Sequence, residues 1–249
     1  MKQIEPQALL ERIYPQRRCY FTEYVDLSRP EMIAKWAIRC YANESETCYA
    51  VTWKYPTWNV VNFIGYDRDF CNELLRQYKN TDGAFVLRPG EPLPKISIRG
   101  LKLDCSYESF SGEGPMPQAP MDPRIQLLTK EQHSILLPIA QRPEDLREEY
   151  SILAWMENGA PLGYISYSVY ENVESSWDVS LIHVAPEQRG RGIGTKLAYA
   201  YLKTIREQGE IPYYSGVSNP HSAGAARRAG FQLCSTRHSF HYMRPKFNL

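Results

Sequence analysis

The sequence predicts an α/β chain built on mixed sheet, and three observations support this fold class. The 249 residues are 43% hydrophobic and 23% charged, which is typical of globular proteins and excludes disorder, collagen and coiled coil. Runs rich in β-branched and aromatic residues alternate with runs whose apolar residues recur every three or four positions. In the C-terminal half, antiparallel hairpin strands come first and then alternate with helices, so we expect a mixed sheet.

A segment rich in proline and glycine divides the chain. The sequence GEGPMPQAPMDP at 112–123 holds four prolines and two glycines, which cannot sustain a helix or a strand. A chain of 249 residues also favours two domains over one. We therefore expect an N-terminal α/β domain at 1–111, a linker at 112–123 and a second domain at 124–249.

The first domain is expected to alternate helices and strands. Pro30 opens a helical stretch that reaches Cys40, and the sequence TDG at 81–83 predicts a turn. A second helix is expected at 67–78, where Phe70, Leu74 and Tyr78 are spaced four apart. The remaining predictions are strands at 47–53, 59–65 and 83–87, and short strands within 95–105.

The second domain carries stronger local signals. Thr129 and Gln132 form a capping box that predicts the start of a helix. Asn158 and Gly159 join two strands and predict a tight hairpin turn. The other expected elements are strands at 125–128, 150–156, 161–170, 176–184, 211–217 and 231–242, and helices at 192–206 and 220–229.

Charge and cysteine content exclude several classes of protein. The formal net charge of +1 supplies no basic field for nucleic acid. No apolar run is long enough to span a membrane, and the first residues lack the apolar core of a signal peptide, so we expect a cytoplasmic protein. The six cysteines form no CxxC pair, which predicts reduced, packed thiols and no metal site.

The segment APEQRGRGIGTK at 185–196 carries the clearest chemical signal. Three glycines at alternate positions, Gly190, Gly192 and Gly194, lie between an expected strand and an expected helix. Glycine allows left-handed backbone and close approach, and free amides at a helix start attract anions, so this turn suits a diphosphate. Arg189, Arg191 and Lys196 surround the turn. A flexible turn with solvated arginines is the alternative, whereas the spacing disfavours a dinucleotide fingerprint and excludes a Walker loop.

These residues carry a family resemblance. The run from Arg189 to Gly194 matches the R/Q-x-x-G-x-G/A motif of the GNAT superfamily of N-acetyltransferases, and 218–233, SNPHSAGAARRAGFQL, resembles a downstream segment of that family. The chain resembles the branch that acts on small molecules. The resemblance implies a GNAT fold in the C-terminal half and acetyl-CoA as co-substrate.

The resemblance also implies which residues bind coenzyme A. Amides of Arg189, Gly190, Arg191, Gly192, Ile193, Gly194 and Thr195 would hold the diphosphate. The pantetheine arm would pair with Ile182, His183 and Val184, and the thioester carbonyl would lie near the Val184 N–H. Asn219 and Ser222 would approach the same arm, and Arg227 and Arg228 are candidates for a 3'-phosphate.

Two residues are candidate catalytic groups. Asp178 lies fourteen residues before Gly192, where some family members carry a general base, and three roles stay open for it: base, anchor of the substrate ammonium, or structural hydrogen bonding. Strand alternation places Asp178, Ser180, Ile182 and Val184 on one face, and Trp177, Val179, Leu181 and His183 on the other.

The sequence does not identify which group donates a proton to the departing thiolate of coenzyme A. Ala226 stands where many members carry a tyrosine, so Ser222, Tyr213, Tyr214 or water is the candidate. His183 has a suitable pKa for acid-base work, but a core histidine is the simpler interpretation. Tyr164, Tyr167 and Tyr170 are candidate walls of an acceptor pocket, or plain strand aromatics.

The function expected from these residues is transfer of an acyl group, acetyl by default, from acyl-CoA to a small amine by direct attack in a ternary complex. The alternative is a CoA-binding regulatory module without turnover, and a dinucleotide-binding enzyme is third. The first half resembles that of two-domain glycine N-acyltransferase-like proteins, as a degenerate copy of the same fold. A homodimer is left open as an assembly.

Overall fold

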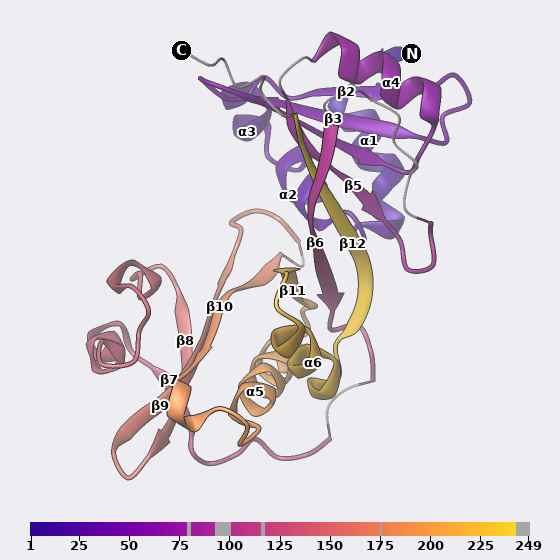
Figure 1. The fold of residues 1–249 in the computed structure, drawn as a ribbon. Coiled ribbons are helices and arrows are strands. Elements are labelled where there is room, and N and C mark those ends of the chain that lie inside the picture. Colours follow the sequence, from indigo (N-terminus) through magenta and orange to yellow (C-terminus); the bar gives the residue numbers. More distant parts are fainter. Residues whose placement is uncertain (79–80, 93–100, 116–117, 175, 243–249) are drawn as a thin grey trace. The chain divides into compact units, whose positions relative to one another are not determined.

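The computed structural model describes residues 1–78, 81–92, 101–115, 118–174 and 176–242. Its contacts divide the chain into two compact units (Figure 1): unit 1 is residues 1–109 with 234–249, and unit 2 is residues 110–233. The last strand contributes mostly to unit 1, because it pairs with a strand of that unit. The boundaries of these units therefore differ from the expected domains 1–111 and 124–249, which stay a sequence-based prediction.

Unit 1 contains a sheet in which the first five strands lie in sequence order, followed by β12 and β6. β4 and β5 are parallel from Val60 to Ile64, whereas β1–β2, β2–β3, β3–β4 and β5–β12 are antiparallel. The strands are β1 (Lys2–Ile4), β2 (Arg39–Ala42), β3 (Tyr49–Lys54), β4 (Asn59–Ile64), β5 (Asp82–Leu87), β6 (Leu101–Ser111) and β12 (Gln232–Tyr242). The expected strands at 47–53, 59–65 and 83–87 are thus confirmed.

The helices of unit 1 pack beside this sheet. They are α1 (Pro6–Ile13), a 3-10 turn η1 (Tyr14–Gln16), α2 (Phe21–Leu27), α3 (Pro30–Lys35) and α4 (Arg68–Gln77). Phe70 and Leu74 of α4 lie in one buried cluster with Phe63, Phe85 and Phe240 from the sheet. The spacing of Phe70 and Leu74 therefore predicted α4 correctly, whereas α1 and α2 were not predicted.

Two expectations for unit 1 are wrong. The helix from Pro30 ends at Lys35 because Ala37 adopts left-handed backbone (φ 43°), and the Ile38 N–H closes the helix on the Ile33 carbonyl at 3.0 Å. Cys40 therefore lies in β2. Gly83 is no turn residue either: a Cβ there would lie 2.0 Å from the Val61 oxygen, so glycine allows close strand packing. Residues 95–100 of the expected strands lie outside the described residues.

In unit 2 the neighbouring strands of the sheet follow the order β6-β11-β10-β9-β8-β7. Its elements are β7 (Ile125–Leu128), η2 (Lys130–Leu136), η3 (Pro143–Asp145), β8 (Ser151–Glu157), β9 (Ala160–Val169), β10 (Trp177–Val184), η4 (Pro186–Gln188), α5 (Ile193–Glu207), β11 (Pro212–Val217) and α6 (Pro220–Ala229). Every strand and both long helices expected for 125–229 are present. Described residues of 112–123 form neither helix nor strand.

The local signals of unit 2 are confirmed in detail. Asn158 and Gly159 both have positive φ, as a type I′ hairpin turn requires. Gln132 accepts a hydrogen bond from the Thr129 N–H at 2.9 Å, which completes the capping box. The element that follows is a 3-10 helix instead of an α-helix. Pro138 lies two residues beyond its end and cannot donate the next backbone hydrogen bond.

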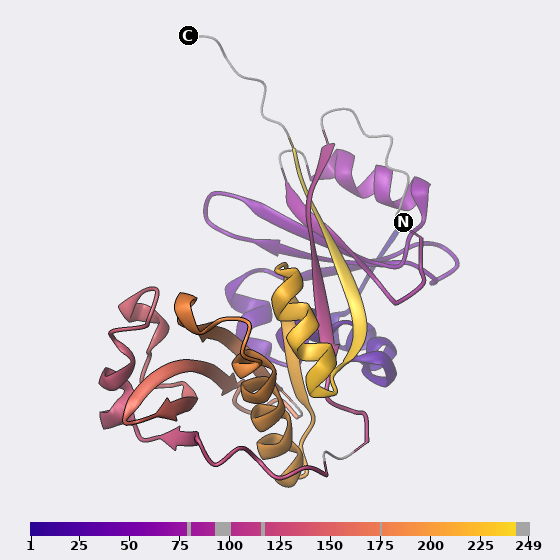
Figure 2. The ribbon, with the colours of Figure 1, turned by 60° about the horizontal axis from the view of Figure 1, so that its bottom comes forward.

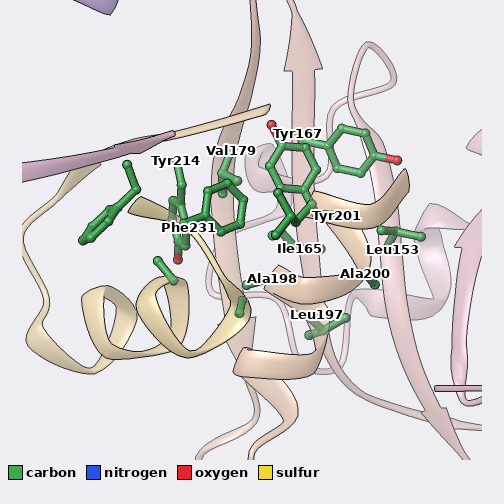
Figure 3. Packing of buried hydrophobic residues seen from close by; sticks show 14 of the residues in the cluster. Leu153, Ile165, Tyr167, Val179, Leu197, Ala198, Ala200, Tyr201, Tyr214 and Phe231 are labelled. Atoms are coloured by element: carbon green, nitrogen blue, oxygen red, sulfur yellow. The ribbon is translucent and has the colours of Figure 1, made fainter. Parts of the chain in front are cut away.

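The core of unit 2 lies between the strands and the helices α5 and α6, which lie side by side (Figure 1, Figure 2). The Tyr201 ring on α5 packs 4.8 Å from the Tyr167 ring and 6.1 Å from the Phe231 ring, between centroids (Figure 3). Its hydroxyl donates to the Tyr213 carbonyl at 3.1 Å, so the buried polar group is satisfied. This packing fixes the middle of α5 against β9 and β11.

No helix in the described ranges has both the length and the apolar character that a membrane crossing requires.

Candidate functional site

The strands β10 and β11 separate soon after they begin. They pair in parallel at Trp177↔Pro212 and Asp178↔Tyr213, and no further pair joins them within the part of the chain that the structure describes. The opposite edge of β10 stays paired with β9 as far as Val184. One edge of β10 from Val179 onward is therefore left without a strand partner among the described residues.

A β-bulge interrupts β10 at the same place. Val179 pairs with Tyr167 and Leu181 pairs with Ser166, so Ser180 is an extra residue in the register. As a result Val179 joins Ile182 and Val184 in the cluster beside α5, whereas Leu181 packs into a different cluster. The expected alternation, with Val179 opposite Ile182 and Val184, is wrong because the bulge reverses the faces at Ser180.

Asp178 bridges the two strands where they separate. Its carboxylate accepts hydrogen bonds from the Ser215 N–H, at 3.0 Å, and from the Ser215 hydroxyl. Burial raises the pKa of Asp178 to about 6, and the bonds from Ser215 oppose this shift. Such a carboxylate is mostly ionised at neutral pH and remains basic enough to accept a proton.

The glycine turn has the geometry of an open cradle. Gly190 and Gly192 have φ of 80° and 78°, in the left-handed region, and no described atom lies within 4 Å of a Cβ built on either. Gly192 is the N-cap of α5, and the first amides of that helix have no acceptor within it. Ile193 is buried and holds the helix start in place. The turn therefore fits a multiply charged anion.

Gly194 differs from the other two glycines. A Cβ there would lie 3.7 Å from Val184 Cγ2 and 3.9 Å from Ile182 Cδ1, which are ordinary contacts. The first turn of α5 thus lies directly over the end of β10. This places the anion cradle and the unpaired strand edge next to one another.

The three cations expected around the turn are engaged by other groups. Arg189 Nε donates to the Val184 carbonyl at 3.2 Å, which ties the turn to β10. Arg191 pairs with Glu157 at 2.9 Å, and Lys196 pairs with Asp122 at 2.9 Å. Hydrogen bonds from Arg124, then Lys196, lower the pKa of Asp122, so it stays ionised. Glu157 and Asp122 were not predicted, because they lie far from the motif in sequence.

The two arginines of α6 have different surroundings. Arg228 Nε donates to Thr195 Oγ1 at 3.4 Å, so its guanidinium lies beside the first turn of α5. Arg227 instead lies over the Phe110 ring, 5.0 Å from its centroid. Of the two candidates for a phosphate contact, Arg228 is the one that the structure brings to the cradle.

The start of α6 brings the remaining candidate residues together. Asn219 caps the helix by accepting from the His221 N–H at 2.8 Å. The Ser222 hydroxyl is hydrogen bonded to the Tyr214 hydroxyl, and burial raises the pKa of Tyr214 to about 12. Ala226 is fully buried in the same cluster as Tyr214. Tyr214 and Ser222 thus supply hydroxyl groups next to the position that lacks a tyrosine.

His183 belongs to a different environment. It is 6% exposed, its ring centroid lies 5.8 Å from that of Tyr164, and burial lowers its pKa. Tyr164 packs in the cluster that contains Leu136 and Ile152, away from the residues beside α5. The side chain of His183 is therefore a core histidine, and its contribution to the predicted site is limited to its backbone.

Unit 1 shares one strand–helix–strand order with unit 2 but lacks the separated strands and the glycine turn found there. β4, α4 and β5 correspond in order to β10, α5 and β11, and β4 pairs with β5 as far as Ile64, so these strands do not separate. The start of α4 is closed by Asp67, which accepts from the Asp69 and Phe70 amides at 3.0 Å. An acidic cap occupies the position where unit 2 has a glycine turn.

Among the residues that the structure describes, no three His, Cys, Asp or Glu side chains are grouped as metal ligands would be.

Comparisons with known proteins agree with this geometry. The profile of the Acetyltransferase (GNAT) family matches residues 119–231. A GCN5-related N-acetyltransferase from Sphaerobacter thermophilus is 13% identical with a TM-score of 0.57, over 100% of this chain and 96% of that one. A GNAT-family acetyltransferase from Colwellia psychrerythraea is 16% identical with a TM-score of 0.55, over 97% and 99% of the two chains. No curated protein matches the sequence significantly.

The likeness to these structures shows the fold, and the family profile covers β10, the glycine turn and all of α6. Residues 119–231 therefore form a domain of the Acetyltransferase (GNAT) family, and this is the part of the chain that the family profile matches.

Proposed function

We propose that this protein binds acetyl-CoA at the start of α5 and transfers the acetyl group to the amine of a small molecule. The observation that carries this proposal is the pair of left-handed glycines, Gly190 and Gly192, whose Cβ positions face open space before the free amides of α5. When bound, acetyl-CoA supplies an activated acyl group as a thioester. The family supports acyl transfer in general, and the acceptor and the ternary complex are our proposals.

The binding residues follow from the arrangement of the turn. Amides from Arg189 to Thr195 hold the diphosphate, and the Arg228 guanidinium beside Thr195 adds a positive charge. The unpaired edge of β10 accepts the pantetheine arm as a partial strand, along Ile182, His183 and Val184. The Val184 carbonyl already accepts a hydrogen bond from Arg189, so the other backbone N–H and C=O groups on the unpaired edge of β10 bind the pantetheine arm.

Two sets of side chains would move protons during direct transfer. Asp178, with a pKa of about 6, accepts the proton that the attacking ammonium must lose. Tyr214, hydrogen bonded to Ser222, donates a proton to the sulfur as the bond between carbon and sulfur breaks. Asn219 fixes the start of α6 and so positions Ser222. The chain itself forms no covalent intermediate in this scheme.

A second candidate function is a CoA-binding module without turnover, and the observation that favours it is Ala226 at the usual tyrosine position. Release of free thiol from acetyl-CoA, measured against a panel of primary amines, separates the two. Amine-dependent thiol release above the rate of hydrolysis supports the enzyme. Tight CoA binding with no release for any amine supports the module, and absence of CoA binding refutes both.

A further inference from the structure

Unit 1 contains a cavity of about 500 Å³ that the CoA site does not use. It lies against the face of the sheet that carries α2, and strands β3, β4, β5, β6 and β12 contribute to its wall. Its volume is within the range of sites that hold small organic molecules, roughly 300–1,000 Å³. The side chains that line this cavity therefore indicate which class of ligand it can bind.

Aromatic rings form one wall of this cavity. Trp53, Tyr55 and Trp58 line it, and the Tyr55 and Trp58 rings are stacked with centroids 4.7 Å apart and planes 17° apart. Trp36 packs on Tyr55 as well, at 4.6 Å. Trp58 nevertheless remains 44% exposed, although it is one of the largest apolar side chains of the protein. A supported but exposed indole is a surface on which a cation binds well.

Carboxylates face the same space. Asp26, Asp82 and Asp104 line the cavity, and neither Asp82 nor Asp104 has a cationic partner among the described residues. Asp26 is held in place by the Trp53 indole N–H at 3.0 Å and by Arg29 at 2.9 Å. The wall therefore carries two carboxylates whose charge the described part of the chain does not compensate.

The one arginine on the wall does not reverse this charge. Arg237 is bound at 2.9 Å to Glu23 Oε1, which also accepts from the Asn62 amide at 2.7 Å. Glu23 is completely buried, and its second oxygen, Oε2, has no hydrogen-bond partner in the described structure. The positive charge of Arg237 is thus already matched by an interior carboxylate. Among the described residues that line the cavity, His241 is the other basic side chain.

We infer that this cavity is a binding site for a small organic cation with an aliphatic ammonium group. Tryptophan and tyrosine rings attract such a group through their electron-rich faces, and Asp82 and Asp104, which line the cavity, add charge attraction. Anionic ligands are disfavoured by the same carboxylates. The inference does not depend on the proposed function, because every residue that lines the cavity belongs to unit 1.

Calorimetry on the full-length protein tests this inference with choline as the probe and 3,3-dimethylbutan-1-ol, its uncharged isostere, as the control ligand. We expect choline to bind at one saturable site and the isostere not to bind. Trp58→Ala and the double variant Asp82→Asn with Asp104→Asn should each weaken choline binding at least about fivefold. Both changes are at exposed side chains, so the fold is retained, and circular dichroism confirms it.

Two further variants separate this site from others. Glu31→Gln removes an exposed carboxylate of α3 outside the cavity and should leave choline binding unchanged. Gly190→Asp, which targets the CoA cradle, should also leave it unchanged. The inference is overturned if choline shows no saturable binding, if the isostere binds equally well, or if the cavity variants bind choline as the wild type does.

Discussion

Asp178 on β10 accepts both the backbone N–H and the hydroxyl of Ser215 on β11, at the point where the two strands stop pairing. The Asp178 side chain thus accepts the hydrogen bond of the Ser215 amide near the point where backbone pairing between β10 and β11 ends. Asp178 is half-buried, and desolvation raises the pKa of its carboxyl group to about 6. This relationship allows the roles of Asp178 as a base and as a structural link to be tested separately.

Replacement of Asp178 by asparagine should lower turnover at least about 100-fold and leave CoA affinity nearly unchanged, because the variant cannot accept a proton. For the wild type we expect activity to rise with pH through an apparent pKa of about 6. Rates over a pH series measure both. An unchanged rate in Asp178→Asn would reject the assignment as base.

Stability gives an independent test of the same residue. The folded protein holds the Asp178 proton more tightly than the unfolded chain does, since the pKa is raised from 3.8 to about 6. Ionisation of Asp178 therefore reduces the free energy of unfolding as pH rises from about 4 to 6, by up to about 3 kcal/mol. Urea denaturation should show this loss in the wild type and not in Asp178→Asn. If Asp178→Asn is instead less stable than the wild type above pH 6, the role of Asp178 is purely structural.

The two arginines of α6 form a matched pair for a binding experiment. Arg228→Gln should weaken CoA binding about fivefold, because Arg228 lies beside Thr195 at the start of α5. Arg227→Gln should have little effect on CoA affinity, because Arg227 packs over Phe110. Equal effects of the two changes on the dissociation constant would show that the Arg228 contact is not part of the site.

Tyr214→Phe should reduce turnover about tenfold or more if its hydroxyl donates the proton to the sulfur. With a pKa of about 12, Tyr214 stays protonated throughout the usual assay range. Tyr167→Phe is the control. Tyr167 belongs to the same cluster, and because it is 2% exposed and packs its ring against Tyr201, it does not line an open acceptor pocket. Steady-state turnover rates of both variants test this role. Equal rates in Tyr214→Phe and Tyr167→Phe would mean that Ser222 or water donates the proton to the sulfur.

Unit 1 should contribute no CoA site, so calorimetry should give one CoA per chain. Its α4 helix is capped by Asp67, whose carboxylate occupies the helix start and repels an anion. Asp67→Ala should lower the free energy of unfolding by about 1 kcal/mol and leave the CoA stoichiometry at one. A stoichiometry of two would contradict this account of unit 1.

Local signals explain most of what the sequence predicted. Asn158 with Gly159 predicted a hairpin turn, and Thr129 with Gln132 predicted the capping box at the start of η2, because turn and cap preferences act over a few residues. The glycine turn was found for the same reason: Gly190 and Gly192 occupy backbone that other residues rarely adopt.

The features that were missed depend on partners far away in sequence. The bulge at Ser180 is set by the register with β9, and the pairing of Arg191 with Glu157 joins the glycine turn to the end of β8. The buried contact of Glu23 with Arg237 spans 214 positions. Ala37 also ends its helix in left-handed backbone, where glycine is the usual signal. None of these follows from periodicity or local propensity.

The binding of CoA by two variants at Gly190 tests the central claim, that the amides at the start of α5 hold the diphosphate. Asparagine tolerates the left-handed backbone of this position, and aspartate has the same shape with a negative charge. Calorimetry should show that Gly190→Asp binds CoA at least about tenfold more weakly than Gly190→Asn, with the difference shrinking at high salt. Equal affinities of the two variants for CoA would contradict the claim.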